Sequence, residues 1–373
     1  MVLQADTLSK KLEIRRNLLL QEIFLKGPIG RRQLGRNLRM SNSRLCQVVQ
    51  EMIDGSLINE HLDRTERRGR RPIPLSTNPD YGCFVGLDFE AKRMRVVVVD
   101  FSGQVLFKRQ QKLGPMKERK TLIDQLLGFV DQGLEAAKAL KTEVLGVGVA
   151  APGTIHRKSG TLVRHDLIEA AHDIPLRDLI EGHTNLPCVV DNNIRCYALT
   201  EWTSGAARHM SNFICIAVRS GFGMAIMLDG KALNGSHELS GEAGSSPAPS
   251  HKPISQWKTL NELVSEKALE VDTEAKSLTI SKRKAKSAGE ILGAQAASLA
   301  ILLDPEAIIL AGALLEPEGP LWDIVKQTYR RFILPDVTDR VVLIPSQVGR
   351  YAAAVGATHR CFQELYSTKL ESD

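Results

Sequence analysis

The chain has 373 residues, of which 43% are hydrophobic and 25% are charged, and it contains neither a signal-like N-terminus nor a membrane-length apolar run. Its six cysteines form no CxxC pair, so we expect a cytoplasmic protein of two or three domains with no disulfide framework, metal, cofactor or membrane contact. The net charge of +6 arises within residues 1–78, where 15 Lys and Arg face 8 Asp and Glu, which indicates contact with phosphate backbones unless this stretch is a solvated tail.

Residues 1–78 show a succession of three predicted helices. Apolar residues recur at helical spacing over residues 12–24, and Gly27-Pro28 ends this first helix. Residues 31–38 suit a short second helix, and Ser41 is a favourable N-cap for a third. The third helix has one continuous apolar face, made of Leu45, Val48, Val49, Met52 and Ile53.

The opposite face of the third helix is polar. Its first turns carry small hydroxyl, amide and guanidinium groups, which can hydrogen-bond to base edges in a major groove. Predicted strands at residues 56–60 and 73–76 then flank a glycine-centred turn with four arginines, which is typical of a wing; a charged interdomain linker is the alternative. The sequence therefore predicts a winged helix-turn-helix that binds double-stranded DNA. The predicted DNA contacts are Arg31, Arg32, Ser41, Asn42, Ser43, Arg44, Gln47, Arg67, Arg68, Arg70 and Arg71.

From Cys83 onward the pattern changes to alternating strands and helices. Strands are predicted at residues 84–89, 95–101, 104–110 and 143–153, with a helix at residues 122–140 before the last of them. A similar second half follows, with strands at 213–218, 223–228 and 307–314. We therefore expect two related α/β lobes, at residues 79–200 and 201–350, with a C-terminal helix at residues 351–368 completing the first.

With these motifs the chain resembles the ROK family, which groups sugar kinases with sugar-responsive repressors on an actin-like, ribonuclease-H-like fold. The resemblance runs from about Leu12 to the C-terminus, and residues 28–60 with the GRRP segment after them are similar to the DNA-binding module of the family's regulators. It implies a winged helix-turn-helix followed by a two-lobed body of the sugar-kinase type.

The kinase motifs of the family are altered in this chain. Its kinases carry a DxGGTK phosphate loop, whereas this chain has DFEAKR at residues 88–93, and we expect Glu90 to oppose a nucleotide phosphate by charge and bulk. Their ENDAN segment corresponds to DNNIR at residues 191–195, so Asn193 replaces the catalytic base, and an amide cannot accept that proton. The alternative is that Asp191 serves as the base.

The zinc motif of the family is also absent. GExGH and its following cysteine cluster correspond here to GEAGS at residues 241–245, so all four ligands implied by the resemblance are missing. The glycine-rich segments 220–223 and 309–313 are similar to the nucleotide loops, or are tight turns between strands. Three histidines match no ligand spacing and are predicted loop residues: His156, His165 and His172. The resemblance still implies sugar contacts at Gly153, Asn192, Asn193 and Glu242.

These observations lead to one preferred function and two alternatives. We predict a transcriptional regulator, a repressor of carbohydrate-related genes, that binds its operator as a homodimer or dimer of dimers. A sugar or sugar phosphate in the interlobe cleft is the expected effector, because closure of two lobes around a ligand can change the spacing of two DNA-binding heads. The alternatives are an ATP-dependent sugar kinase and a DNA-binding regulator that needs no ligand.

Overall fold

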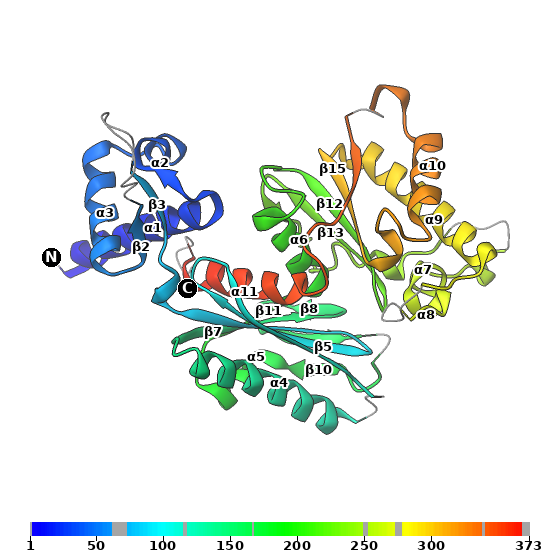
Figure 1. The fold of residues 1–373 in the computed structure, drawn as a ribbon, viewed down its shortest axis with the longest axis horizontal. Coiled ribbons are helices and arrows are strands. Elements are labelled where there is room, and N and C mark those ends of the chain that lie inside the picture. Colours follow the sequence, from blue (N-terminus) through cyan, green and yellow to red (C-terminus); the bar gives the residue numbers. More distant parts are fainter. Residues whose placement is uncertain are drawn as a thin grey trace.

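The computed structural model describes residues 2–61, 73–114, 118–165, 168–248, 253–272, 278–337 and 340–367. In chain order these residues form a small head and two α/β lobes (Figure 1). The predicted wing arginines, Arg67, Arg68, Arg70 and Arg71, lie outside the described residues. Within the described ranges, no helix combines the length and the apolar character needed to cross a membrane.

The head consists of three helices and a small antiparallel sheet of order β1-β3-β2. The second and third helices lie within a residue of their predicted positions, whereas α1 begins ten residues earlier than the apolar spacing indicated. On the sheet, β2 pairs with β3, and β1 pairs with the other edge of β3. The elements are α1 (Val2–Lys26), β1 (Ile29–Gly30), α2 (Arg31–Asn37), α3 (Asn42–Asp54), β2 (Ile58–Glu60) and β3 (Pro74–Thr77).

The apolar face predicted for α3 is buried in the head. Leu45, Val48, Val49 and Met52 are at most 1% exposed and pack against Leu19, Leu20 and Ile23 of α1. Ser41 stands at the N-cap of α3, as predicted, but its side chain makes no capping hydrogen bond. Because Ser41 is exposed, water can satisfy the free N–H groups of the first turn.

The first lobe is built on a five-stranded sheet of order β11-β7-β4-β5-β6. β4, β5 and β6 form an antiparallel meander, and β7 and β11 continue the sheet in parallel. Helix α4 covers one face and α11 the other, so every residue of β4 and β5 is buried. The elements are β4 (Cys83–Phe89), β5 (Arg93–Asp100), β6 (Val105–Lys112), α4 (Arg119–Ala139), β7 (Val144–Ala151), β11 (Cys188–Asn192) and α11 (Ala352–Leu365).

A short antiparallel sheet is inserted between β7 and β11, with one helix after it. Its order is β10-β9-β8, and its register places the end of β9 beside the start of β8. The sequence pattern did not indicate this insertion, because its strands are only three or four residues long. The elements are β8 (Thr154–His156), β9 (Thr161–Arg164), β10 (His172–Pro175) and α5 (Leu176–Thr184).

The second lobe repeats the strand arrangement of the first. Its sheet has the order β14-β13-β12-β15-β16, again with an antiparallel β12–β13 hairpin and two parallel strands beyond it. Two related lobes were therefore correctly predicted. The elements are α6 (Asn193–Ser204), β12 (Phe213–Val218), β13 (Phe222–Leu228), β14 (Lys231–Ala232), α7 (Asn261–Val264), α8 (Glu266–Leu269), α9 (Lys282–Leu303), β15 (Ala307–Ala311), α10 (Trp322–Phe332) and β16 (Val342–Pro345).

Helix α6 crosses α11 between the two sheets. A Cβ atom on Gly356 of α11 would lie 1.8 Å from the carbonyl oxygen of Cys196 on α6. Only glycine therefore permits this crossing. The first turn of α6, which begins at the interlobe cleft, is therefore in direct backbone contact with α11.

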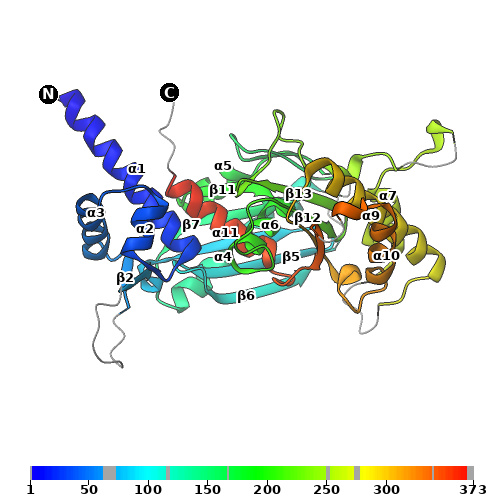
Figure 2. The ribbon, with the colours of Figure 1, turned by 90° about the horizontal axis from the view of Figure 1, so that it is seen from above.

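The head is anchored to the body through α1, which lies beside α11 (Figure 2). The side chain of Asn17 donates to the carbonyl oxygen of Ser367 at 2.8 Å, and that of Gln21 to the carbonyl oxygen of Tyr366 at 2.7 Å. Phe24 stacks on Phe362 of α11 with ring centroids 4.3 Å apart. The core of the head is thus continuous with side chains of the first lobe.

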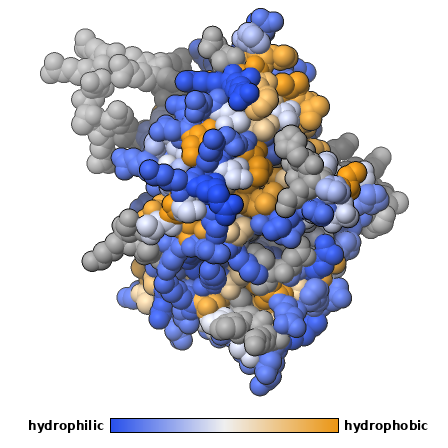
Figure 3. Space-filling model, turned by 90° about the vertical axis from the view of Figure 1, so that its right-hand side faces the viewer, coloured by the Kyte–Doolittle hydropathy of each residue, from blue (hydrophilic) through white to orange (hydrophobic). Residues whose placement is uncertain are grey.

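The outer side of the second lobe exposes apolar side chains. Figure 3 shows this side, with apolar residues gathered in its upper half among hydrophilic ones. The large apolar side chains that the second lobe exposes include Ile254 at 79%, Leu302 at 77%, Phe332 at 54% and Leu334 at 51%. A contiguous apolar patch on a surface can contact another protein.

Candidate functional site

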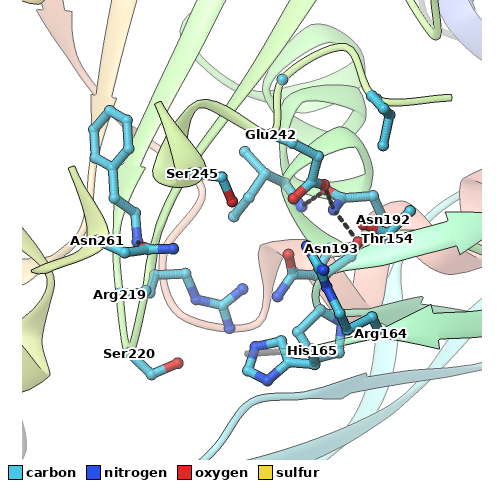
Figure 4. A pocket seen from close by; sticks show the side chains of 18 of the residues that line it. Thr154, Arg164, His165, Asn192, Asn193, Arg219, Ser220, Glu242, Ser245 and Asn261 are labelled. Carbon is cyan, nitrogen blue, oxygen red and sulfur yellow. Dashed lines mark hydrogen bonds between the residues drawn. The ribbon is translucent and has the colours of Figure 1, made fainter. Parts of the chain in front are cut away.

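A cavity of about 510 Å³ lies between the two lobes (Figure 4). It is bounded by the end of β7, the start of α6, the β12–β13 turn and the segment after β14. All four residues that the sequence predicted as ligand contacts line it, namely Gly153, Asn192, Asn193 and Glu242. The chain therefore brings together residues that lie far apart in sequence.

Asn192 joins three parts of the cleft wall. As the N-cap of α6, its Oδ1 accepts the N–H groups of Ile194 at 2.8 Å and Arg195 at 3.3 Å. Its Nδ2 donates to the carbonyl oxygen of Gly153 at 3.0 Å and to Oε1 of Glu242 at 3.2 Å. The amide is fully engaged, so a ligand can bind Asn192 only by replacing one of these bonds.

Gly153 has a structural reason to be glycine. Its φ is +78°, and an added Cβ would lie 2.2 Å from the carbonyl oxygen of Arg164. Any side chain at this position would push β9 away from the cleft and would occupy a strained backbone conformation. The glycine therefore supports the shape of the cavity whether or not a ligand is bound.

Several residues that line the cleft have no signal in the sequence. His165, predicted to be a loop residue, follows β9 and faces the cavity together with Arg164 and Arg219 (Figure 4). The loop prediction was wrong for the other two histidines, because His156 ends β8 and His172 begins β10, both exposed. The β9 segment reaches the cleft only through the inserted sheet, which no local motif indicated.

Asn193 is the residue that the resemblance aligns with the base of the family's kinases. It is the first residue of α6, is 7% exposed and lines the cavity. Asp191, the alternative base, is not among the lining residues of this cavity. Burial by itself would raise the pKa of Asp191, but the adjacent Arg195, Arg157 and Arg360 hold it below its usual range. Asp191 is therefore held as a paired carboxylate away from the cleft.

The altered phosphate loop contains a buried network of ion pairs. The carboxylates of Asp88 and Glu90 lie between two guanidinium groups, with Arg95 Nη1 at 2.8 Å and Arg219 Nη2 at 2.6 Å from Asp88 Oδ2. Both arginines also bind Oε1 of Glu90, and Ser220 Oγ donates to its Oε2 at 3.1 Å. The network joins β4 and β5 of the first lobe to the end of β12 in the second lobe.

The structure corrects the expected role of Glu90. Its side chain is 1% exposed; burial would raise its pKa, but Arg219 and Arg95 lower it far below the usual range. The carboxylate is thus ionised and neutralised, so the expected repulsion of a phosphate by its free charge is wrong. Guanidinium and carboxylate groups fill this space and satisfy one another.

A cavity of about 280 Å³ lies on the other side of this network and is lined by part of the glycine-rich segment 309–313, whereas the segment 220–223 lines the interlobe cleft. Arg93 extends the network here, with its Nη1 3.4 Å from Oε2 of Glu266 on α8. Gly312 has a φ of +106°, and an added Cβ would lie 2.1 Å from the carbonyl oxygen of Val218. Close packing of β15 on β12 is therefore sufficient to require this glycine. This favours the interpretation of segment 309–313 as a tight turn between strands rather than a nucleotide loop.

The zinc motif position is occupied by Ser245, which lines the cleft from a short 3-10 helix. In the parts of the chain that the structure describes, no three His, Cys, Asp or Glu side chains are grouped as a metal site would require. Ser245 and Asn261 instead supply a hydroxyl and an amide to the wall of the cavity. These groups suit a hydroxylated ligand, since each can donate and accept hydrogen bonds.

The polar face of α3 forms a second candidate site, on the head. Asn42, Ser43, Arg44 and Gln47 are all exposed, opposite the buried apolar face of the same helix. Gln47 Nε2 lies 3.1 Å from Oε1 of Glu51, so its amide is held along the helix surface.

The two predicted contacts on α2 differ from each other in their surroundings. Arg32 is exposed, whereas Arg31 Nη2 pairs with Oε1 of Glu60 at 2.6 Å. This ion pair ties the start of α2 to β2 and leaves Arg31 about one-third exposed, at 32%. Arg32 is therefore the freer of the two to reach a phosphate.

Comparisons with known proteins agree with this architecture. The model of the ROK family matches residues 84–363. The xylose repressor of Caldicellulosiruptor bescii is 25% identical over 232 residues, 62% of this chain and 58% of that protein; the xylose repressor of Bacillus spizizenii is 23% identical over 92% of this chain and 94% of its own. The solved structure of a ROK family transcriptional regulator, a homologue of E. coli Mlc, superimposes with a TM-score of 0.77 at 22% identity, covering 96% of this chain and 97% of that one.

Proposed function

The chain belongs to the ROK family, and on this premise we propose that it is a DNA-binding transcriptional repressor of carbohydrate-related genes. Similarity to two xylose repressors supports a repressor, because one of them matches over nearly its whole length. The observation that carries the proposal is the exposed polar face of α3, whose opposite, apolar face is buried in the core of the head.

We assign the head as a winged helix-turn-helix, with α2 and α3 as the two helices of the motif and the β2–β3 hairpin as the base of the wing. α3 presents hydroxyl, amide and guanidinium groups on one exposed side, as a recognition helix must to reach base edges. The predicted wing arginines follow β2 in sequence and would add affinity through phosphates. This division places the DNA-binding domain at residues 1–78 and the two lobes of the body after it.

Selection of genomic fragments on the purified full chain, followed by sequencing, tests this function. We expect enriched fragments to share a sequence and to lie near genes of carbohydrate metabolism. The double variant Arg44→Ala, Gln47→Ala is the matched control, since both side chains are exposed and their removal leaves the core of the head intact. Enrichment of the same fragments by the control would refute recognition through α3.

We further propose that the interlobe cleft binds a small carbohydrate. A volume of about 510 Å³ admits a monosaccharide, and the wall offers a carboxylate, amides and a hydroxyl from Glu242, Asn193, Asn261 and Ser245. Closure on a ligand would act on α6, whose first turn forms part of the wall, and so on α11 and α1.

Glu242→Gln should weaken monosaccharide binding about 10-fold or more, because it replaces a charged acceptor by a neutral amide. Isothermal titration of the full chain against a panel of neutral sugars measures this loss. Glu135→Gln, on the exposed side of α4, is the control and should leave the affinity unchanged. A chain that binds no sugar in the panel would favour the regulator that needs no ligand.

We also propose that the chain is not a kinase. Asn193 cannot take a proton from a sugar hydroxyl, and the Asp88, Glu90, Arg95 and Arg219 network occupies the phosphate side of the cleft. Transfer of radiolabelled phosphate from ATP to a panel of hexoses should stay at background for the wild type and for Asn193→Asp. Turnover by the wild type above that of a Glu242→Ala control would contradict the proposal.

A homodimer completes the proposed function. Operators read by two heads require two copies of the chain, and the apolar side chains exposed on the second lobe, such as Leu302 and Phe332, supply a surface for association. We therefore place the contact between copies on the second lobe, which leaves both heads free.

A further inference from the structure

A second cavity, of about 490 Å³, lies where α1, α6 and α11 meet. Gln21 and Leu25 of the head line it together with Arg195 of α6 and Arg360 of α11. Among the described residues, none lines both this cavity and the interlobe cleft. We call it the junction cavity, since it lies between the head and the body.

Three guanidinium groups converge on one carboxylate in this cavity. The Nε atoms of Arg195, Arg157 and Arg360 lie 2.7 Å, 3.2 Å and 3.2 Å from the carboxylate oxygens of Asp191, which is 5% exposed. Arg360 also binds Glu364 at 2.8 Å, but Glu364 is 54% exposed and its charge is screened by water. Lys231 and Asp229 also line the cavity, so its wall carries four positive and three negative groups.

Arg195 is the least satisfied of the three arginines. Its side chain is 3% exposed, and Nη1 and Nη2 have no hydrogen-bond partner among the described residues. A buried guanidinium with free donors is unfavourable unless an acceptor is supplied. Arg195 and Arg157 face Asp191 with their Nε atoms, so their Nη groups remain to bind a further anion, whereas Nη2 of Arg360 already binds Glu364.

The rest of the wall suits a hydroxylated body rather than a bare ion. Trp202, Leu199 and Met227 provide an apolar side, and Oδ1 of Asn234 is a buried acceptor with no partner among the described residues. An acceptor of this kind requires a hydroxyl or amine donor.

We propose that the junction cavity binds a phosphorylated sugar or polyol, with the phosphate monoester on the guanidinium groups of Arg195, Arg157 and Arg360. Guanidinium groups match phosphate in planar geometry and charge, and a dianion neutralises the surplus around Asp191. The polyhydroxylated part lies between Trp202 and Asn234.

Ligand binding at this cavity also bears on the head. Gln21, which lines the cavity, is the side chain that fastens α1 to the carbonyl oxygen of Tyr366. A ligand that contacts both α1 and α11 favours the head position in which these contacts exist, and so changes operator affinity. This consequence rests on the proposed DNA-binding function, whereas binding of the phosphate does not.

Isothermal titration of the full chain with glucose 6-phosphate, inorganic phosphate and glucose tests the site without DNA. We expect binding of glucose 6-phosphate, weaker binding of inorganic phosphate, and a loss of about 10- to 100-fold in affinity for glucose 6-phosphate in Arg157→Gln and Arg360→Gln. Arg208→Gln, an exposed arginine after α6, is the matched control and should bind as the wild type does.

Wild-type affinity in both arginine variants would overturn the site. Asn234→Asp is a second test in case the arginine variants fail to fold, because it keeps the shape of the side chain and removes no buried arginine. The added negative charge should repel the phosphate and weaken its binding. Operator titrations with and without glucose 6-phosphate then test the coupling separately. If operator affinity is unchanged at saturating glucose 6-phosphate, the effect of the ligand on the head is refuted, but the phosphate site is not. If the chain binds no operator, the proposed DNA-binding function is refuted, and the phosphate site is again unaffected.

Discussion

Replacing Arg219 by methionine should lower the free energy of unfolding by about 3 to 5 kcal/mol, because it leaves two buried carboxylates without their cross-lobe partner. Asp88 and Glu90 are 0% and 1% exposed, so neither can turn to water when the guanidinium is lost. Arg95 remains in contact with both carboxylates, and Arg93, which pairs with Glu266, acts on Glu90 more weakly, so the two carboxylates are no longer fully neutralised. Urea denaturation at neutral pH measures the loss.

Two controls separate this effect from the general cost of losing a long side chain. Arg208→Met changes the same residue type at an exposed position and should alter stability by no more than about 0.5 kcal/mol. Adding Asp88→Asn and Glu90→Gln to Arg219→Met should restore part of the stability, because the unpaired charges are removed. A loss below about 1 kcal/mol in Arg219→Met would show that the network does not hold the lobes together.

The pH dependence of this network has a definite sign. The pKa of Glu90 is depressed in the folded chain, so its pairing stabilises the fold above the usual glutamate pKa of about 4.3 and is lost as pH falls toward the depressed value. The wild type should therefore lose stability on acidification. In Arg219→Met the carboxylates gain less from ionisation, and the difference from wild type should shrink as pH falls.

The same network explains why one part of the site could be anticipated and another could not. The junction of β11 and α6 is local, so the motif at residues 191–195 correctly placed Asn192 and Asn193 at the cleft. Arg219 lies 129 residues from Glu90 and belongs to no motif, so only the closed lobes reveal that it neutralises that carboxylate. The role of Glu90 was misjudged for this reason.

Asp191 gives a second example of the limit of motif comparison. Its position in the ENDAN-like segment made it an alternative base. In the structure its carboxylate is paired with Arg157, which directly follows β8, and with Arg360, which lies 169 residues later on α11. In the head, by contrast, the apolar spacing of α3 sufficed, because a short amphipathic helix has one buried face and the remaining face is exposed. Periodicity predicts elements and their faces, whereas long-range ion pairs depend on tertiary packing.

The buried ion pairs between the lobes and the contacts that attach the head both bear on how far the lobes can move. A kinase must open and close its lobes at each turnover, while a ligand-responsive repressor needs only two positions that differ in operator affinity. A buried ion-pair network across the lobes favours one closed arrangement, and the core that is continuous through Phe24 and Phe362 packs the head against the first lobe.

Arg44→Ala should weaken operator binding by about 1 to 3 kcal/mol. The affinity for random duplex DNA should fall less, by no more than the loss of one phosphate contact would cause. The guanidinium of Arg44 is exposed on the first turn of α3, where a recognition helix reaches base edges, and Leu45 beside it is buried and fixes the helix orientation. Fluorescence anisotropy with both duplexes at one salt concentration separates the two affinities. Gln50→Ala, exposed near the other end of the same helix, is the matched control and should leave both unchanged. Equal losses on operator and random DNA would mean that Arg44 contacts only the backbone, and α3 would then not be the helix that reads the sequence.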